Sequence, residues 1–245
     1  AKRIINETSE STWEKMSLAG KEWYNKNCSP DGSFEVTKQI IEHVRENQKG
    51  KKTPEKTKPK SICTFCTDMC KNDIDLLLKS MKEFNKDVPI YLLCDEKIKM
   101  FVNNNYSELN IQMKQDLDKF SGKNRKQMEQ EGIFTEMMKL KTKTIEYALD
   151  NEHDTLYVDS DIVFLDEIPD VDNTKQLGMC PHYIKKSNTD LHGYYNAGMI
   201  YVNTREFTKW WIKKIETTNK KDDGTHDQKS LDEVPMEFNH FEFDM

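Results

Sequence analysis

The sequence lacks any apolar run of the roughly 18 to 20 residues that a membrane-spanning helix needs, and its N-terminus has no signal-peptide pattern. Six cysteines in 245 residues are too few for a disulfide scaffold, so we expect reduced thiols and a cytoplasmic location. The chain also lacks a basic excess. Its net charge of −6 argues against a general nucleic-acid binder.

The first 49 residues predict a helical N-terminal extension. Ser11 and Thr12 can cap a helix that carries Trp13 and Trp23, and a second amphipathic helix is expected at 36–44. Residues 50–60 are basic, contain two prolines and have no apolar residue, which predicts a flexible linker.

Strands and helices are expected to alternate over residues 61–245, the predicted catalytic domain. The expected strands lie at 61–67, 88–95, 109–117, from 155 onward and around 198–203; the expected helices lie at 73–85, 96–106, 133–151, 204–218 and 226–234. This alternation predicts an α/β fold with a Rossmann-like, mostly parallel sheet flanked by helices. Ligands of such sheets bind beyond the carboxyl ends of the strands. The polar stretch 116–134 is expected to be mobile and to close over a ligand.

Two aspartates, Asp159 and Asp161, stand at the end of an apolar strand, in the stretch TLYVDSDIVFLDEIP. Residues two apart on an extended chain point the same way, so the two carboxylates would repel each other without a cation. A hard divalent ion, Mn²⁺ or Mg²⁺, suits such ligands and would bring a diphosphate with it. The alternative is a strand-end turn with two solvated aspartates. Three other Asp-x-Asp pairs, at 73–75, 116–118 and 170–172, begin a helix or lie in polar surroundings and serve as controls.

Four segments in fixed order resemble the GT-A-fold glycosyltransferases, in particular the glycogenin-like and bacterial galactosyltransferase-like group. They are KLKTKTIEYALDN, DTLYVDSDIVFLDEIP, GYYNAGMIYVNT and HDQKSLDEVP. The resemblance covers residues 61–245. It implies a GT-A catalytic domain, a nucleoside-diphosphate sugar as donor, with UDP-sugar as the family default, and a glycan or other hydroxyl acceptor.

The resemblance also implies roles for single residues. The first strand and its loop would hold the nucleoside, and the helix before the aspartate pair would present a lysine, with Lys141 aligning better than Lys143. The implied donor-binding residues are Thr64, Cys66, Thr67, Asp95, Lys141, Lys143, Asp159, Ser160, Asn196, Ala197, Gly198 and Gln228.

Asp227 is the implied catalytic residue. It would be the general base of an inverting enzyme, or would orient the acceptor in a retaining one, with Asp190, His192 and His226 in reserve. His240 is the candidate third metal ligand beside Asp159 and Asp161, although the glycine and lysine of the family's histidine motif are absent.

Two other functional classes stay open at this point. A nucleotidyltransferase or phosphohydrolase could use the same carboxylates and metal, although no G-x-x-x-x-G-K phosphate loop occurs. A non-catalytic nucleotide-sugar-binding relative is the other class. A zinc site at Cys63, Cys66 and Cys70 is disfavoured because structural zinc normally takes four ligands.

Overall fold

The computed structural model describes residues 10–27, 57–182, 189, 192–218 and 227–244. The chain divides into two units, residues 1–53 and 54–245. In the first unit the structure describes one helix, α2 (Glu10–Asn27). Because α2 begins at Glu10, Ser11 and Thr12 lie inside it, and the prediction that they cap it is wrong. The helix expected at 36–44 lies outside the described residues.

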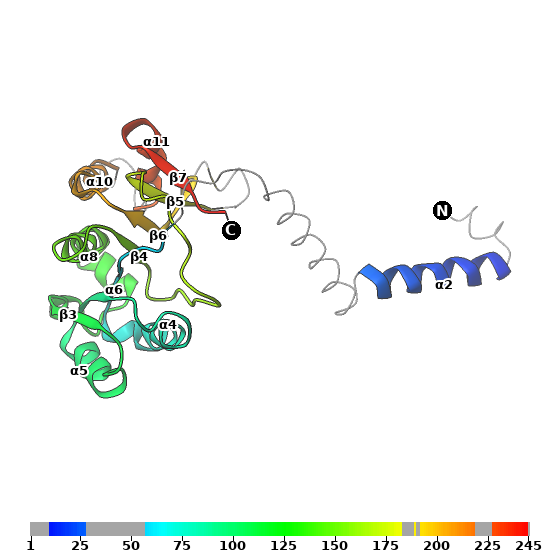
Figure 1. Ribbon diagram of the computed structural model, residues 1–245, viewed down its shortest axis with the longest axis horizontal. Helices are drawn as coiled ribbons and strands as arrows, with labels where there is room; N and C mark the ends of the chain where they lie inside the picture. Colours follow the sequence, from blue (N-terminus) through cyan, green and yellow to red (C-terminus); the bar gives the residue numbers. More distant parts are fainter. Residues whose placement is uncertain (1–9, 28–56, 183–188, 190–191, 219–226, 245) are drawn as a thin grey trace. The chain divides into compact units, whose positions relative to one another are not determined.

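The second unit is built on a seven-stranded sheet (Figure 1). Its strands are β1 (Ile62–Cys66), β2 (Ile90–Cys94), β3 (Ile111–Gln115), β4 (Thr155–Val158), β5 (Leu177–Pro181), β6 (Tyr195–Val202) and β7 (His240–Glu242). Their spatial order is β3-β2-β1-β4-β6-β5-β7. β1 to β4 are mutually parallel, β7 is parallel to β5, and β6 runs antiparallel to both β4 and β5. The predicted α/β fold with a mostly parallel sheet is therefore confirmed.

Helices and short 3₁₀ turns connect the strands. They are η1 (Asp68–Cys70), α4 (Lys71–Phe84), α5 (Glu96–Asn105), η2 (Asp118–Phe120), α6 (Arg125–Gln130), α7 (Phe134–Met138), α8 (Leu140–Leu149), α10 (Arg205–Thr218), η3 (Lys229–Glu233) and α11 (Val234–Glu237). Among the helices that the structure describes, none combines the length and apolar character that a bilayer crossing needs.

Two apolar clusters hold these helices on opposite faces of the sheet. Successive side chains of a strand point to opposite faces, and along β1 Cys63 and Phe65 belong to one cluster while Ile62 and Cys66 belong to the other. α8 and α10 contribute to the first cluster, and α4 and α5 to the second. All residues of β1 and β2 are buried, which explains the continuous apolar run of β2; β1 is interrupted only by Thr64.

The strand order reverses direction at β1. The chain continues from β1 outward through β2 to β3, and then returns to place β4 on the other side of β1. The chain that leaves β1 thus leads to β2 on one side of the sheet, and the chain that leaves β4 leads to β5 on the other side. Such a switch point opens a crevice in which α/β proteins bind ligands.

Several elements differ from the sequence expectations. The helix expected over 133–151 is divided into α7 and α8. The polar stretch 116–134 carries η2 and α6, and α6 begins with a capping box between Asn124 and Gln127. β5 and β7 were not predicted. β5 contains Gly178 and ends at Pro181, residues that weaken a strand pattern, and β7 has only three residues.

The last residues of the predicted linker belong to the second unit and contact other segments of it. Thr57 forms a β-bridge with Val171. Lys58 Nζ donates to the carbonyl oxygen of Ile168 at 2.6 Å, and the Lys60 N–H donates to Asp154 Oδ1 at 2.7 Å. The division into 1–49, 50–60 and 61–245 stays a prediction.

Candidate active site

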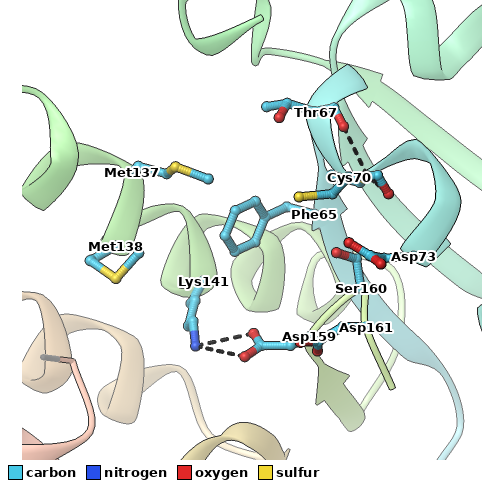
Figure 2. A pocket seen from close by; sticks show the side chains of 11 residues that line it. Phe65, Thr67, Cys70, Asp73, Met137, Met138, Lys141, Asp159, Ser160 and Asp161 are labelled. Atoms are coloured by element: carbon cyan, nitrogen blue, oxygen red, sulfur yellow. Dashed lines mark hydrogen bonds and ion pairs between the residues drawn. The ribbon is translucent and has the colours of Figure 1, made fainter. Parts of the chain in front are cut away.

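A cavity of about 200 Å³ lies at the switch point, where β1 and β4 end (Figure 2). Its wall combines the end of β1 with η1, the first turn of α4, the α7–α8 region and the residues after β4. The lining residues are Phe65, Cys66, Thr67, Cys70, Asp73, Met137, Met138, Lys141, Asp159, Ser160 and Asp161. The aspartate pair predicted from the sequence is thus part of a concave site that several distant segments build.

Asp159 is held by the protein on both carboxylate oxygens. The hydroxyl of Tyr157 donates to Oδ1 at 2.5 Å, and Lys141 Nζ lies 3.1 Å from Oδ1 and 3.3 Å from Oδ2. The backbone N–H of Asp159 donates to the carbonyl oxygen of Gly198 on β6 at 2.8 Å. Burial raises the pKa of Asp159, and Lys141 and Tyr157 oppose that rise because they favour the carboxylate. Asp159 therefore has a fixed orientation.

Lys141 joins three segments of the chain. Its side chain is only 7% exposed, and its ammonium lies 2.8 Å from Asp227 Oδ2, 3.1 Å from the carbonyl oxygen of Ala197 and within 3.3 Å of both Asp159 oxygens (Figure 2 shows the two contacts with Asp159). Burial lowers the pKa of Lys141, but the carboxylates of Asp227 and Asp159 outweigh it, and the net pKa is raised. Lys141 is therefore a charged residue at the centre of the site.

Asp161 differs from Asp159 in its surroundings. β4 ends at Val158, and a turn follows in which the Ile162 N–H donates to the carbonyl oxygen of Asp159 at 3.1 Å. The chain is thus not extended through Asp161, contrary to the geometry behind the sequence argument. Both carboxylates still line the cavity, together with Ser160. Asp159 is partly buried, whereas Asp161 is exposed.

The Asn196–Gly198 segment begins β6 beside the aspartate turn. Gly198 has no room for a side chain, because a Cβ there would lie 2.9 Å from Asn196 Oδ1 and 3.1 Å from Asp159 Oδ2. The Gly198 N–H donates to Asn196 Oδ1 at 2.6 Å. Asn196 and Gly198 line a second, larger cavity rather than the first one. Ala197 is buried and contributes its carbonyl oxygen to Lys141.

Asp227 and Gln228 approach the site from the segment before η3. Asp227 is 6% exposed. Its carbonyl oxygen accepts hydrogen bonds from the Trp211 indole N–H at 3.3 Å and from the hydroxyl of Ser230. Gln228 Oε1 accepts from the Ala197 N–H at 3.4 Å. These contacts attach the Asp-Gln pair to α10 and β6 and hold the Asp227 carboxylate against Lys141.

The residues expected to contact the nucleoside divide into two groups. Cys66 and Thr67 line the cavity, and burial raises the pKa of the Cys66 thiol well above its usual range. Thr64 is fully buried in β1, away from the cavity. Asp95 is also fully buried: its Oδ1 accepts from the Ile98 N–H at 2.9 Å and its Oδ2 from the Asp68 N–H at 2.8 Å. Asp95 thus caps α5 and holds the start of η1.

Other candidates lie away from the cavity or outside the described residues. Lys143 is exposed and lies 4.0 Å from Asp116. His240 is on β7, where its Nε2 is 3.1 Å from the Tyr195 hydroxyl and its Nδ1 is 3.3 Å from the carbonyl oxygen of Phe238. His192 is partly buried and does not line the cavity. Asp190 and His226 lie outside the described residues.

The sequence analysis gave no role in this site to Asp73, Cys70 and Tyr157, which the structure places in its wall or in contact with Asp159. Asp73, treated as a helix-start control, lines the cavity. The thiol of Cys70 lies nearby; burial raises its pKa first, and the charges of Asp73 and Asp161 raise it further. Tyr157 holds Asp159 through the hydrogen bond from its hydroxyl. Its place two residues before Asp159 on a strand was a usable signal, because such residues point the same way.

The oxygen atoms of the cavity side chains are of the kind that binds a hard cation, but the protein side chains alone do not complete its coordination. Within the described part of the chain, no group of three or more His, Cys, Asp or Glu side chains is arranged to hold a metal ion. Asp161, Asp73 and Ser160 are nevertheless side chains of the kind that Mg²⁺ or Mn²⁺ uses when it keeps water and phosphate oxygens as its other ligands.

Comparisons with known proteins identify the family of the chain and support its fold. Residues 90–240 match the family model described as nucleotide-diphospho-sugar transferase. Among solved structures, the galactosyltransferase LgtC in complex with donor and acceptor sugar analogs is similar at a TM-score of 0.52 and 17% identity, over 73% of this chain and 71% of that one. The apo form of the glycosyltransferase GlyE of Streptococcus pneumoniae TIGR4 gives a TM-score of 0.49 at 15% identity, over 74% of this chain and 45% of that one. A comparison with curated protein sequences gives no match.

Proposed function

The chain belongs to the family of nucleotide-diphospho-sugar transferases and is a glycosyltransferase with a GT-A fold, and we propose that it transfers a sugar from a UDP-sugar to an acceptor hydroxyl with the help of Mn²⁺ or Mg²⁺. The acceptor is a glycan or another hydroxyl compound. The five described cysteines are free thiols, which supports a reducing, cytoplasmic location as part of the proposal.

One observation carries the metal dependence: the charge of the cavity wall. Asp73, Asp159 and Asp161 line the cavity with Lys141 as its only cation among the described lining residues. Three carboxylates and one ammonium leave a formal charge of −2. A diphosphate is itself strongly negative, and like charges at close range repel, the more so in a concave site of reduced dielectric. A divalent cation between the wall and the diphosphate removes this repulsion.

The residues that would hold the metal are Asp161 and, as a second ligand, Asp159. Asp161 is exposed to the cavity, whereas both oxygens of Asp159 already accept contacts from Tyr157 and Lys141. A bound divalent ion acts as a Lewis acid that stabilises the negative charge of a departing nucleoside diphosphate. Both ring nitrogens of His240 face protein oxygens, which makes His240 the weaker candidate.

The remaining donor contacts follow from the walls of the cavity. Cys66 and Thr67 lie at the end of β1, where the nucleoside would pack, and Ser160 offers a hydroxyl beside the diphosphate. A volume of about 200 Å³ is below the range of about 300 to 1,000 Å³ that holds complete small-molecule ligands. The cavity thus suits the diphosphate, with the nucleoside extending out of it past Thr67 and the sugar extending toward Gln228.

Asp227 and Lys141 act together in this proposal. The Asp227 carboxylate lies 2.8 Å from the buried ammonium of Lys141 and is held by it. This geometry supports a role in which Asp227 holds Lys141 and, through it, Asp159. A general base for an inverting reaction would require Asp227 to separate from Lys141, or another residue such as His192 to act.

Calorimetric titration of UDP, and then GDP, with and without Mn²⁺ tests the proposal. We expect binding of UDP that requires Mn²⁺ and that is lost in Asp161→Ala. Asp116→Ala is the matched control, because Asp116 belongs to another Asp-x-Asp pair and lies outside the cavity. Metal-independent binding, or equal losses in both variants, would contradict the proposed metal site. Binding of GDP alone would mean that the donor is a GDP-sugar and not a UDP-sugar.

A further inference from the structure

The second cavity, here called the apolar groove, is about 640 Å³ in volume. It lies in the same unit as the first cavity, which is called the donor cavity from here on. Its walls come from the segment after the aspartate turn, from β5 and β6, and from the end of β7. The lining residues are Ile162, Val163, Phe164, Leu165, Asp166, Glu167, Pro169, Cys180, Asn196, Gly198, Met199, Phe243 and Asp244. This volume is within the range of sites for small organic ligands.

The outer wall of the groove, residues 162–169, is fixed by side chains from elsewhere. Ser80 Oγ accepts from the Phe164 N–H at 3.1 Å, and Asn85 Oδ1 accepts from the Ile168 N–H at 2.8 Å. Lys58 Nζ donates to the Ile168 carbonyl oxygen at 2.6 Å. The wall thus presents its side chains in defined positions, although it is an irregular segment.

Large apolar side chains are presented on this fixed wall. Leu165 is 87% exposed and Val163 is 44% exposed. Phe164 and Phe243 are buried side chains of the groove lining, and Met199 is a partly buried one. An exposed leucine alone needs no explanation, but here it borders a large apolar concavity on a segment that other residues hold in place. This combination favours a ligand site.

The groove lies next to the aspartate turn. Asp161 lines the donor cavity and the following residue, Ile162, lines the groove, while the carbonyl oxygen of Gly198 in the groove wall accepts from the Asp159 N–H at 2.8 Å. Asn196 Oδ1 is occupied by the Gly198 N–H. The Asn196 side chain is thus held against the backbone of Gly198, in the part of the groove wall that is next to the aspartate turn.

The charge of the groove restricts its ligand. Asp166, Glu167 and Asp244 line it, and none of the described lining residues carries a positive charge. Lys58 lies 3.3 Å from Glu167 and offsets part of this charge. Since like charges repel, the groove disfavours an anionic ligand such as a phosphate-bearing lipid and favours a neutral or cationic one.

We propose that the apolar groove binds the acceptor, and that this acceptor carries an apolar group, neutral or positively charged, beside the hydroxyl that receives the sugar. The proposal rests on the proposed function of the donor cavity. The acceptor hydroxyl would enter past Asn196 and Gly198, while its apolar body would pack on Leu165, Met199 and Phe243. A highly hydroxylated sugar alone would leave these apolar surfaces uncovered.

Three probes of similar size and different charge test the proposal: 2-phenylethylamine, 2-phenylethanol and 3-phenylpropionate. Each is titrated into the full chain with methyl-labelled methionine and leucine, with Met199 and Leu165 as NMR reporters. We expect the amine and the alcohol to bind at the groove, and the amine to bind about five-fold more tightly than the carboxylate. Leu165→Ser should weaken all three, and combined Asp166→Asn and Asp244→Asn should abolish the preference for the amine.

The controls separate this proposal from the donor site. Leu76→Ser replaces another exposed leucine, outside both cavities, and should leave probe binding unchanged. Manganese-dependent UDP binding, measured on the same samples, should persist in Leu165→Ser. Absence of probe binding while UDP still binds overturns the groove proposal alone. Displacement of the probes by UDP or a UDP-sugar with Mn²⁺ assigns the groove to the donor and overturns its acceptor role, as does equal binding of the carboxylate.

Discussion

Replacing Lys141 by methionine should destabilise the whole catalytic unit. The change keeps most of the apolar stem but removes the ammonium that lies within 3.3 Å of Asp227, Asp159 and the Ala197 carbonyl oxygen. Breaking a buried ion pair by removing one partner costs about 3 to 5 kcal/mol, because a buried charge is left uncompensated. Asp227 is 6% exposed, but the side chain of Asp159 is 35% exposed and can be hydrated. We therefore expect a loss of about 3 kcal/mol, at the low end of this range.

Urea unfolding measures this loss, with Lys143→Met as the matched control. Lys143 lies in the same helix, but its side chain is 55% exposed and its partner Asp116 is 4.0 Å away, so its removal should cost less than about 1 kcal/mol. Equal stability of the two variants would refute the view that Lys141 compensates buried carboxylates.

The pH dependence of the Lys141→Met deficit gives a second, independent test. Burial already raises the folded-state pKa of Asp159, and Lys141 opposes this rise; without the ammonium that pKa should rise further, so the folded state of the variant binds more protons than the unfolded state. Stability then increases as the pH falls. The deficit relative to the wild type should shrink between pH 8 and pH 5. A deficit that is constant with pH would point to lost packing instead.

Three further predictions concern neighbouring residues. Tyr157→Phe removes the hydroxyl that donates to Asp159 and should weaken manganese-dependent UDP binding by about ten-fold in calorimetry, because a hydrogen bond to a charged group is lost; unchanged affinity would show that Asp159 needs no such support. Gly198→Ala should cost about 1 to 3 kcal/mol in urea unfolding, since its Cβ would press on Asn196 and Asp159, whereas Gly20→Ala, whose Cβ meets no atom within 4 Å, should cost nothing. The hydrogen bond from Lys97 lowers the pKa of Asp68 from 3.8 to about 2, so its stabilising contribution is present above pH 4 and is lost as the pH falls toward 2; acid unfolding of Asp68→Asn should lack this component, and a profile like that of the wild type would count against it.

The sheet was predictable because its central strands are buried on both faces. β2 shows an uninterrupted apolar run, β1 is interrupted only by Thr64, and α4 between them shows a clear amphipathic period. β5 and β7 gave no such signal, since one contains a glycine that packs against Phe241 and the other has three residues. Their pairing depends on contacts between distant segments, which local sequence patterns do not encode.

The candidate site was predictable in its residue types and only partly in its geometry. Local spacing placed Asp159 and Asp161 at a strand end, and the structure confirms that position. It did not show that Lys141 pairs with both Asp159 and Asp227, because residues from α8, β4 and the segment before η3 meet only in the folded chain. Asp73 was missed for the same reason: its position at a helix start gave a sufficient local explanation.

The arrangement around Lys141 implies that donor binding and folding share the same contacts. Lys141 draws its three acceptors from the turn after β4, from β6 and from the segment before η3, and each of these segments also lines or borders the donor cavity. A ligand that binds only the folded state adds stability in proportion to its concentration over its dissociation constant. Nucleotide with Mn²⁺ should therefore stabilise the wild type strongly. It should restore little stability to Lys141→Met, because the lost contact both weakens the fold and misplaces Asp159, which we propose as a ligand of the metal that binds the nucleotide.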